Sequence, residues 1–192
     1  ARRRGGAARS ARPSRPCRRC SAASRGRLKQ SQELTRAAAD MALRKNLKQA
    51  AGLTLLIGAA SEALVGDRTP ARRHVAEALE LDRGPESLAS AAQALGLTGD
   101  TTEAQALADE AKGKMPRTNT LFQAINLSQA LAAIALGGNA PEKSLEALKT
   151  AAPYERGKIV VPYLRGLAHL EQRRGVLGVL LHLHVLGLPS WL

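Results

Sequence analysis

The chain has 192 residues, which is long enough for one domain with a hydrophobic core. It is rich in alanine and leucine, and only 2% of its residues are aromatic. This composition disfavours a β-sheet protein and predicts an all-α fold, because alanine and leucine lose little conformational freedom in a helix. The formal net charge is +13, yet residues 1–29 hold 11 of the 29 basic residues and none of the 16 acidic ones. The remaining 18 basic and 16 acidic residues give +2, which excludes a strongly basic folded surface.

Residues 1–25 consist almost wholly of arginine, alanine, serine, proline and glycine. We expect disorder there, because such a segment cannot bury enough apolar surface to offset the entropy of ordering. A nucleic-acid-binding arm, a targeting peptide and sequence foreign to the domain are the three interpretations. The segment has neither the apolar core of a secretory signal nor an aromatic residue for base stacking. Cys17 and Cys20 form a lone CxxC pair, so we expect neither a metal nor a redox site.

Beyond Gly26 the apolar residues recur at helical spacing, and turn residues separate the helical segments. Pro116 and Pro153 end helices, because proline bars the residue before it from the α region. Asn119 or Thr120 is positioned to cap the sixth helix. The pattern predicts helices over residues 27–45, 47–65, 71–81, 86–97, 101–113, 121–136, 141–151 and 159–174, and a loop over 154–157.

Two of these helices carry apolar residues that we expect to face the core. In the first helix they are Leu28, Leu34, Ala38, Met41 and Ala42. In the sixth they are Leu121, Ile125, Leu131 and Ile134.

Glycine turns recur along the chain, each between an apolar helix and an alanine-rich one; they lie at Gly26, Gly66, Gly99, Gly138 and Gly175. The repeated unit is therefore helix, turn, helix. One such hairpin cannot bury both of its faces, whereas a stack of hairpins shares a continuous core. We predict a right-handed stack of helix pairs.

The clearest copy surrounds Gly99-Asp100. Small residues at Ala104 and Ala111 lie seven apart, Pro116 lies twelve beyond the first, and Ala92 holds the small position of the preceding helix. This arrangement resembles a tetratricopeptide repeat (TPR). The copy at Gly66 is similar, and the copies at Gly26 and Gly138 depart further. The resemblance implies a TPR-like right-handed α-solenoid over residues 26–175, whose concave groove binds a protein or peptide with the first helix of each pair.

A closer resemblance rests on four segments in order: Gly26-Arg-Leu-Lys-Gln with Glu33-Leu, Met41-Ala-Leu-Arg44, Ala151-Ala-Pro-Tyr-Glu155, and Pro162-Tyr-Leu-Arg-Gly-Leu-Ala168. They resemble the C-terminal repeats of bacterial eukaryotic-like serine/threonine protein kinases, and of related winged-helix regulators that carry repeats. The resemblance implies a sensor or regulatory region of a bacterial signalling protein. Residues 1–192 contain no glycine-rich phosphate loop, no HRD and no DFG, so we expect this chain not to be an enzyme.

The final segment, residues 176–192, is apolar and uncharged. The family pattern would continue past Arg174 with a charged, alanine-rich helix, so we expect both residues 1–25 and 176–192 to come from a truncated or frame-shifted reading of a longer gene. A buried closing helix is the alternative for 176–192. The segment is too short and too interrupted for a bilayer span. His182 and His184 have no acid or cysteine nearby, so we expect no zinc there.

Polar residues on alanine-rich helices need an exposed side, and Gln93, Asn126 and Gln129 are therefore candidates for the groove. Tyr163 and Arg165 are further partner-binding candidates, because tyrosine and arginine anchor interfaces. Intramolecular packing is the alternative for Tyr163.

Two isolated histidines, His74 and His169, are expected to fill packing positions. We find no Ser/His/Asp or paired-carboxylate arrangement at local spacing.

These features predict a non-catalytic protein–protein interaction scaffold without cofactor or metal. We expect it in the cytoplasm, or outside it if the parent is a membrane-tethered kinase. The alternative is a nucleic-acid-associated protein, acting through the arginine-rich segment or as the repeat region of a winged-helix regulator. A third possibility is a signalling-kinase fragment without independent activity.

Overall fold

The fold is all-helical in the computed structural model, which describes residues 26–116, 118–157 and 160–172 and contains no strand in those ranges. The α-helices are α2 (Leu28–Arg44), α3 (Lys48–Leu64), α4 (Arg68–Leu81), α5 (Pro85–Thr98), α6 (Thr101–Lys114), α7 (Ser128–Gly137), α8 (Pro141–Ala147) and α9 (Val160–Glu171). A π-helix, η1 (Phe122–Leu127), leads into α7, and a 3₁₀ helix, η2 (Ala152–Gly157), precedes α9. The predicted all-α class is confirmed. Residues 1–25 and 176–192, with their expected disorder, histidines and cysteines, lie outside the described ranges.

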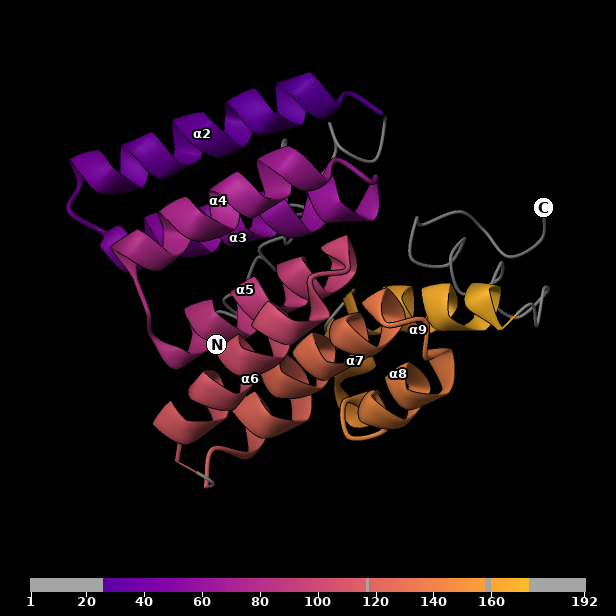
Figure 1. Ribbon diagram of the computed structural model, residues 1–192. Coiled ribbons are helices and arrows are strands. Elements are labelled where there is room, and N and C mark those ends of the chain that lie inside the picture. The colour runs from indigo at the N-terminus through magenta and orange to yellow at the C-terminus, as the bar shows by residue number, and fades with distance from the viewer. Residues whose placement is uncertain (1–25, 117, 158–159, 173–192) are drawn as a thin grey trace, which may run out of the picture.

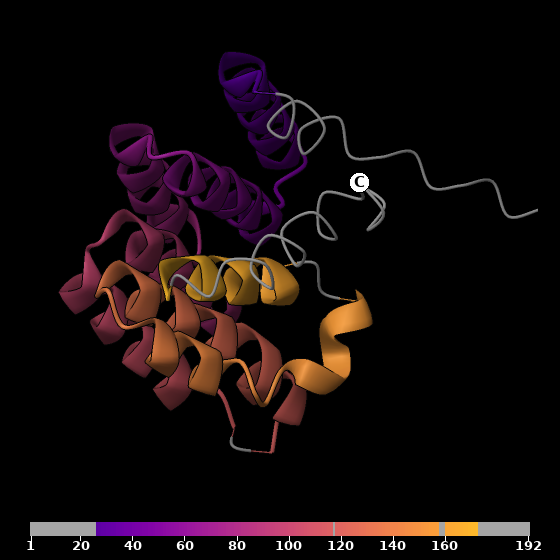
Figure 2. The same ribbon diagram turned by 90° about the vertical axis from the view of Figure 1, so that its right-hand side faces the viewer.

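The helices form successive pairs in contact (Figure 1). We call α3, α5, η1 with α7, and α9 the first helices, and α2, α4, α6 and α8 the second helices, since a glycine turn lies between the two helices of a pair. Pairing joins α3 to α4, α5 to α6 and α7 to α8. Each second helix also contacts the next first helix, and α3, α5, α7 and α9 contact one another in that order. Figure 2 shows the molecule from the side, with α2 (indigo) at the top and α9 (yellow) in the middle of the view.

Small residues let these helices approach closely. Alanines fill much of the core, and in α5 alone Ala89, Ala91, Ala92 and Ala94 are buried. The closest approach joins α5 to α7, where a Cβ on Gly137 would lie 1.9 Å from the carbonyl oxygen of Gly96. The two backbones are therefore in direct contact, with no side chain between them.

Helix α2 faces the core with a different side from the one predicted. Its buried residues are Ser31, Thr35 and Ala39, whereas Met41 is 54% exposed. Helix α3 presents Gly58 to α2, and a Cβ on that glycine would lie 2.6 Å from Cγ2 of Thr35. Close packing selects the small side of α2, and its larger apolar residues are left outward or only half-buried.

The sixth predicted helix begins with a π-helical segment that the sequence pattern did not indicate. Leu121, predicted to face the core, is 55% exposed, while Phe122, Ile125 and Leu127 are buried. A π-helix has a wider turn than an α-helix, so it rotates the residues that follow out of α-helical register. The predicted cap is confirmed at Asn119, whose Oδ1 accepts a hydrogen bond from the backbone N–H of Phe122 at 3.0 Å.

Helix α8 is shorter than predicted, and residues 154–157 are helical and do not form a loop. The N–H of Lys149 already bonds to Glu146 in the i→i−3 pattern, and Ala151, Ala152 and Tyr154 continue it. Pro153 has no N–H to donate, so the α-helical i→i−4 pattern cannot continue through it. The chain tightens into η2 at this corner.

Candidate functional site

A pocket lies where the four first helices converge. It has a volume of about 140 Å³, and its lining residues are Ala63, Leu64, Leu97, Leu136, Gly137, Leu167 and Glu171. We call it the inner pocket. Residues 63–64 end α3, Leu97 lies near the end of α5, residues 136–137 end α7, and Leu167 and Glu171 belong to α9. Four successive first helices therefore contribute to one cavity.

The packing of α5 on α7 determines how far apart two of the pocket-lining leucines lie. Leu97 follows Gly96, and Leu136 precedes Gly137, so the contact between the two glycines fixes how far apart these leucines lie. Any larger residue at either glycine would separate the helices. The pocket depends on the same close approach that holds the first helices together.

Most of the residues that line the inner pocket are aliphatic, but polar atoms contribute more of its exposed surface than apolar atoms do, and Glu171 adds a carboxyl group. Burial raises the pKa of Glu171, because a charged carboxylate is disfavoured where water is partly excluded. Among the described residues, the side chain of Glu171 has no hydrogen-bonding or ion-pair partner. A cavity of this size and lining suits one aliphatic side chain, and the carboxyl group suits a polar or cationic neighbour.

Three predicted groove residues lie on the first helices: Gln93 on α5, Asn126 on η1 and Gln129 on α7. Each is half-buried, and none forms a side-chain hydrogen bond with another described residue. They do not line the inner pocket. Their amide groups are therefore placed on the helices that form the pocket and are available for contacts outside it.

Arg165 has an internal role that its sequence position did not reveal. Its guanidinium forms an ion pair with Glu155 of η2 and donates a hydrogen bond to the carbonyl oxygen of Leu148 at 3.3 Å. It ties α9 to the corner after α8. Tyr163, two residues earlier, is half-buried, and burial raises the pKa of its phenol. The structure thus gives Arg165 an intramolecular function, and any partner would meet only its remaining exposed surface.

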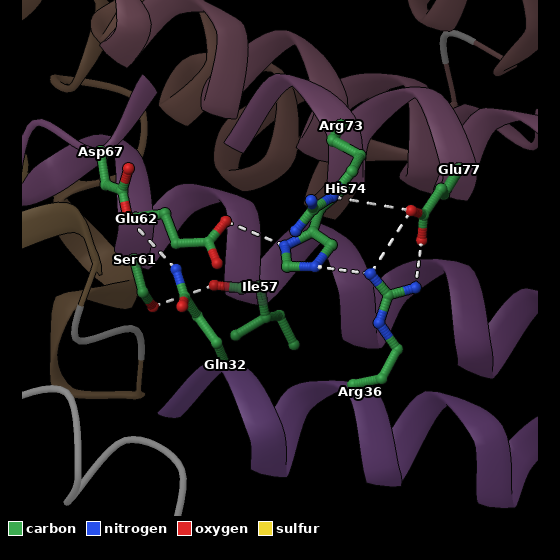
Figure 3. Close-up of polar contacts among 9 residues, drawn as sticks. All are labelled: Gln32, Arg36, Ile57, Ser61, Glu62, Asp67, Arg73, His74 and Glu77. Carbon is green, nitrogen blue, oxygen red and sulfur yellow. Dashed lines mark hydrogen bonds and ion pairs between the residues drawn. The ribbon is translucent and has the colours of Figure 1, made fainter. Parts of the chain in front are cut away.

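A buried polar chain joins α2, α3 and α4 (Figure 3). His74 and Glu62 are each only 2% exposed, and Nδ1 of the imidazole lies 2.9 Å from Oε2 of the carboxylate. Nη2 of Arg36 lies 3.5 Å from the other ring nitrogen, and the same guanidinium pairs with Glu77 at 2.7 Å. The imidazole thus lies between the carboxylate of Glu62 and the guanidinium of Arg36.

His74 looks isolated in the sequence because its partner lies twelve residues earlier. The available signal was Glu62 itself, which directly precedes the buried Ala63 and follows the buried Ala59 by three positions. An acid on the buried side of a helix needs a partner. The expectation that His74 fills a packing position is confirmed by its burial, but it is also hydrogen-bonded.

Further ion pairs connect one helix pair to the next. Arg72 of α4 donates to both carboxylate oxygens of Asp100, at 2.6 and 2.7 Å, and Thr98 donates to Asp100 at 2.6 Å. Arg83, after α4, pairs with Glu110 of α6 at 2.6 Å. The hydrogen bonds from Arg72 hold the pKa of Asp100 below its usual value. No pattern in the sequence indicates these links.

In the described ranges, no group of three histidine, cysteine, aspartate or glutamate side chains is arranged to hold a metal. None of the described helices has both the length and the hydropathy needed to cross a bilayer. No family model matches the chain, and no curated protein or solved structure is significantly similar to it.

Proposed function

We propose that the protein is a non-catalytic scaffold in which the helix pairs form a TPR-like right-handed α-solenoid and the first helices bind a protein or peptide. The order in which the helices contact one another supports this architecture, since each helix packs on its own partner and on the neighbouring pair. The alanine positions around Gly66 and Gly99 support the same assignment: Ala59, Ala71, Ala78, Ala92, Ala104 and Ala111 are all buried.

The inner pocket is the observation that carries the binding proposal. It collects aliphatic side chains from four successive first helices, and repeat proteins use such surfaces for extended ligands. An aliphatic side chain of the partner would occupy the pocket. The amides of Gln93, Asn126 and Gln129 would meet the polar groups of its backbone.

The proposal is tested with two neighbouring substitutions. Leu64 lines the pocket, and Val65, the next residue, does not, although it is the more exposed of the two (59% against 37%). Peptides selected from a random display library on the full chain serve as probes, and their Kd is measured by fluorescence anisotropy. Leu64→Glu should weaken binding by about tenfold or more, as truncation of a binding hot spot does, while Val65→Glu leaves it unchanged.

Equal effects of Leu64→Glu and Val65→Glu would contradict binding at the inner pocket, and failure to select any peptide would contradict peptide binding altogether. Circular dichroism of both variants verifies that their helix content is unchanged.

We further propose that the chain is a sensor or regulatory repeat region of a bacterial signalling protein of the serine/threonine kinase type. The support is the resemblance of the segments at residues 26–44 and 151–168 to that family. A kinase catalytic domain encoded upstream of residue 1 in the same gene would fit the proposal, and a gene without one would remove it. The cytoplasm is the proposed location.

The alternative function, association with nucleic acid, is favoured by one observation, the nine arginines of residues 1–25. Binding of that kind would be lost steeply as salt rises, since it depends on phosphate contacts. Replacing these arginines with serine would abolish it and leave peptide binding intact.

A further inference from the structure

Exposed apolar side chains concentrate at the turn between α2 and α3. Met41, Leu43 and Leu47 are 54%, 40% and 53% exposed. They lie within seven residues of one another, at one corner of the molecule away from α8 and α9 (Figure 1). Asn46 makes the turn with a positive φ of 57°. We call residues 41–48 the α2–α3 turn.

The same turn carries three basic side chains, Arg44, Lys45 and Lys48, all exposed. None of them forms a hydrogen bond or ion pair with another described residue. The sequence has no acidic residue between Asp40 and Glu62. Asp40 lies one helical turn before Arg44, and Asp82 packs beside Gly52 of α3, so two acids offset part of the positive charge of the turn.

Helix stability does not account for this arrangement. Arg44, at the C-terminal end of α2, is favourably placed beside the helix dipole, but Lys48 begins α3, where a positive charge is unfavourable. The first turn of α3 contains no acid, the residue type that normally stabilises this position. Three exposed aliphatic side chains likewise add nothing to the core.

We propose that the α2–α3 turn is a contact site for an anionic membrane surface, with its aliphatic side chains inserted at the boundary between headgroups and acyl chains. Amphiphilic surfaces bind lipid through this combination of buried apolar area and attraction to anionic headgroups. The site is peripheral and involves no spanning helix.

Shape and composition favour lipid over other anionic partners. The turn lies at a corner of the molecule, where a flat surface can reach it (Figure 1). Single-stranded nucleic acid is bound by stacking on aromatic side chains, and residues 41–48 contain none.

Cosedimentation of the full chain with vesicles tests the site. One set of vesicles is phosphatidylcholine alone, and the other contains phosphatidylserine as well. The triple variant R44Q/K45Q/K48Q should reduce partitioning onto the anionic vesicles by about fivefold per cation, or about a hundredfold in all. L43S/L47S should also reduce it, and the binding that remains should be more easily removed by salt, because only electrostatic attraction is left.

The arginines of residues 1–25 will also attract anionic lipid, and a matched variant accounts for them. K112Q/K143Q/R156Q removes three exposed cations elsewhere in the described chain and keeps the N-terminal segment. It should bind the anionic vesicles nearly as well as the wild type. Equal losses in the two triple variants would overturn the proposal in favour of general attraction. Equal binding of the wild type to both vesicle types would also overturn it.

Self-association is the competing use of the exposed apolar residues. If L43S/L47S changes the mass measured by sedimentation velocity and leaves lipid partitioning unaltered, the turn is an interface between copies and not a membrane contact. Neither result would affect the peptide test at Leu64, which lies at the opposite end of α3.

Discussion

Glycine residues at helix crossings fix the spacing of the first helices. Gly137 and Gly96 place the backbones of α7 and α5 in contact, and Gly58 admits Thr35 of α2. Elsewhere a glycine in a helix weakens it by roughly 0.5–1 kcal/mol relative to alanine, because it loses more backbone entropy on folding. At these crossings the close packing outweighs that cost.

Gly137→Ala should therefore destabilise the protein, although alanine is the better helix former. The added Cβ would lie 1.9 Å from a backbone oxygen, which cannot yield as a flexible side chain does. Overpacking of this kind costs about 1–3 kcal/mol or more, measured as a lower urea midpoint.

Gly113→Ala is the matched control. Gly113 lies within α6 with nothing within 4 Å of the added Cβ, so the same substitution should stabilise the protein by about 0.5–1 kcal/mol. Two shifts of the same sign would show that the crossing does not require glycine.

At the scale of the elements, side-chain bonds connect one helix pair to the next. The link between Arg72 and Asp100 joins α4 to the turn before α6, and the pKa of Asp100 is lowered by it. A carboxyl group with a lowered pKa in the folded state stabilises that state above its unfolded pKa. This stabilisation is lost as the pH falls through the folded-state value.

The urea midpoint of the wild type should consequently decrease as the pH is lowered from about 5 to about 2, and Asp100→Asn should flatten part of that decrease. At neutral pH the variant should already be the less stable protein, because an amide cannot replace the charge-assisted bonds from Arg72. Asp40→Asn removes an exposed carboxyl group that has no hydrogen-bonding partner among the described residues, and it should keep the wild-type slope. A wild-type slope in Asp100→Asn would contradict the assignment.

The number and order of the helices could be predicted from the sequence, because the glycine turns and the prolines mark most of their ends. The orientation of α2 could not be predicted. An apolar stripe ordinarily faces the core. In α2, however, the side with the small residues packs inward, because Gly58 on the neighbouring helix leaves room for Thr35. That contact joins residues 23 positions apart and leaves no periodic signal.

The candidate site was predictable only in outline. Choosing polar residues on alanine-rich helices identified Gln93, Asn126 and Gln129, which do lie on the first helices. The inner pocket consists mainly of leucines, which sequence reasoning assigns to the core, and it exists because four helix ends converge. The π-helical turn before α7 also escaped prediction, since an extra residue in one turn does not change composition.

At the scale of the whole molecule, the core divides into two clusters of buried residues. The larger one extends from Ala39 to Ala130. The smaller one takes residues from α7, from the turn between α8 and η2, and from α9; it comprises Ala132, Leu136, Leu148, Ala151, Val161, Leu164 and Ala168. In a structure whose helices contact mainly their neighbours, such clusters can open separately.

Leu164→Ala should reveal this division. Leu164 is fully buried in the smaller cluster, so the cavity should cost about 2–5 kcal/mol. Native-state hydrogen exchange should accelerate in α8 and α9, while α3 and α4 keep their protection. Leu56→Ala, a comparable truncation in the larger cluster, should affect α3 and α4 instead. A uniform loss of protection in all helices after either substitution would mean that the molecule opens as one unit.

The first helices and the second helices are held together by different kinds of contact. The backbones of α5 and α7 are in direct contact and cannot move closer together. The second helices and their flanking turns are connected by arginine–carboxylate ion pairs. These are Arg36 with Glu77, Arg72 with Asp100 and Arg83 with Glu110. Salt screens exposed charges and leaves backbone contacts unaffected. Raising the ionic strength should therefore weaken the bonds between the second helices and leave the contact between α5 and α7 unchanged.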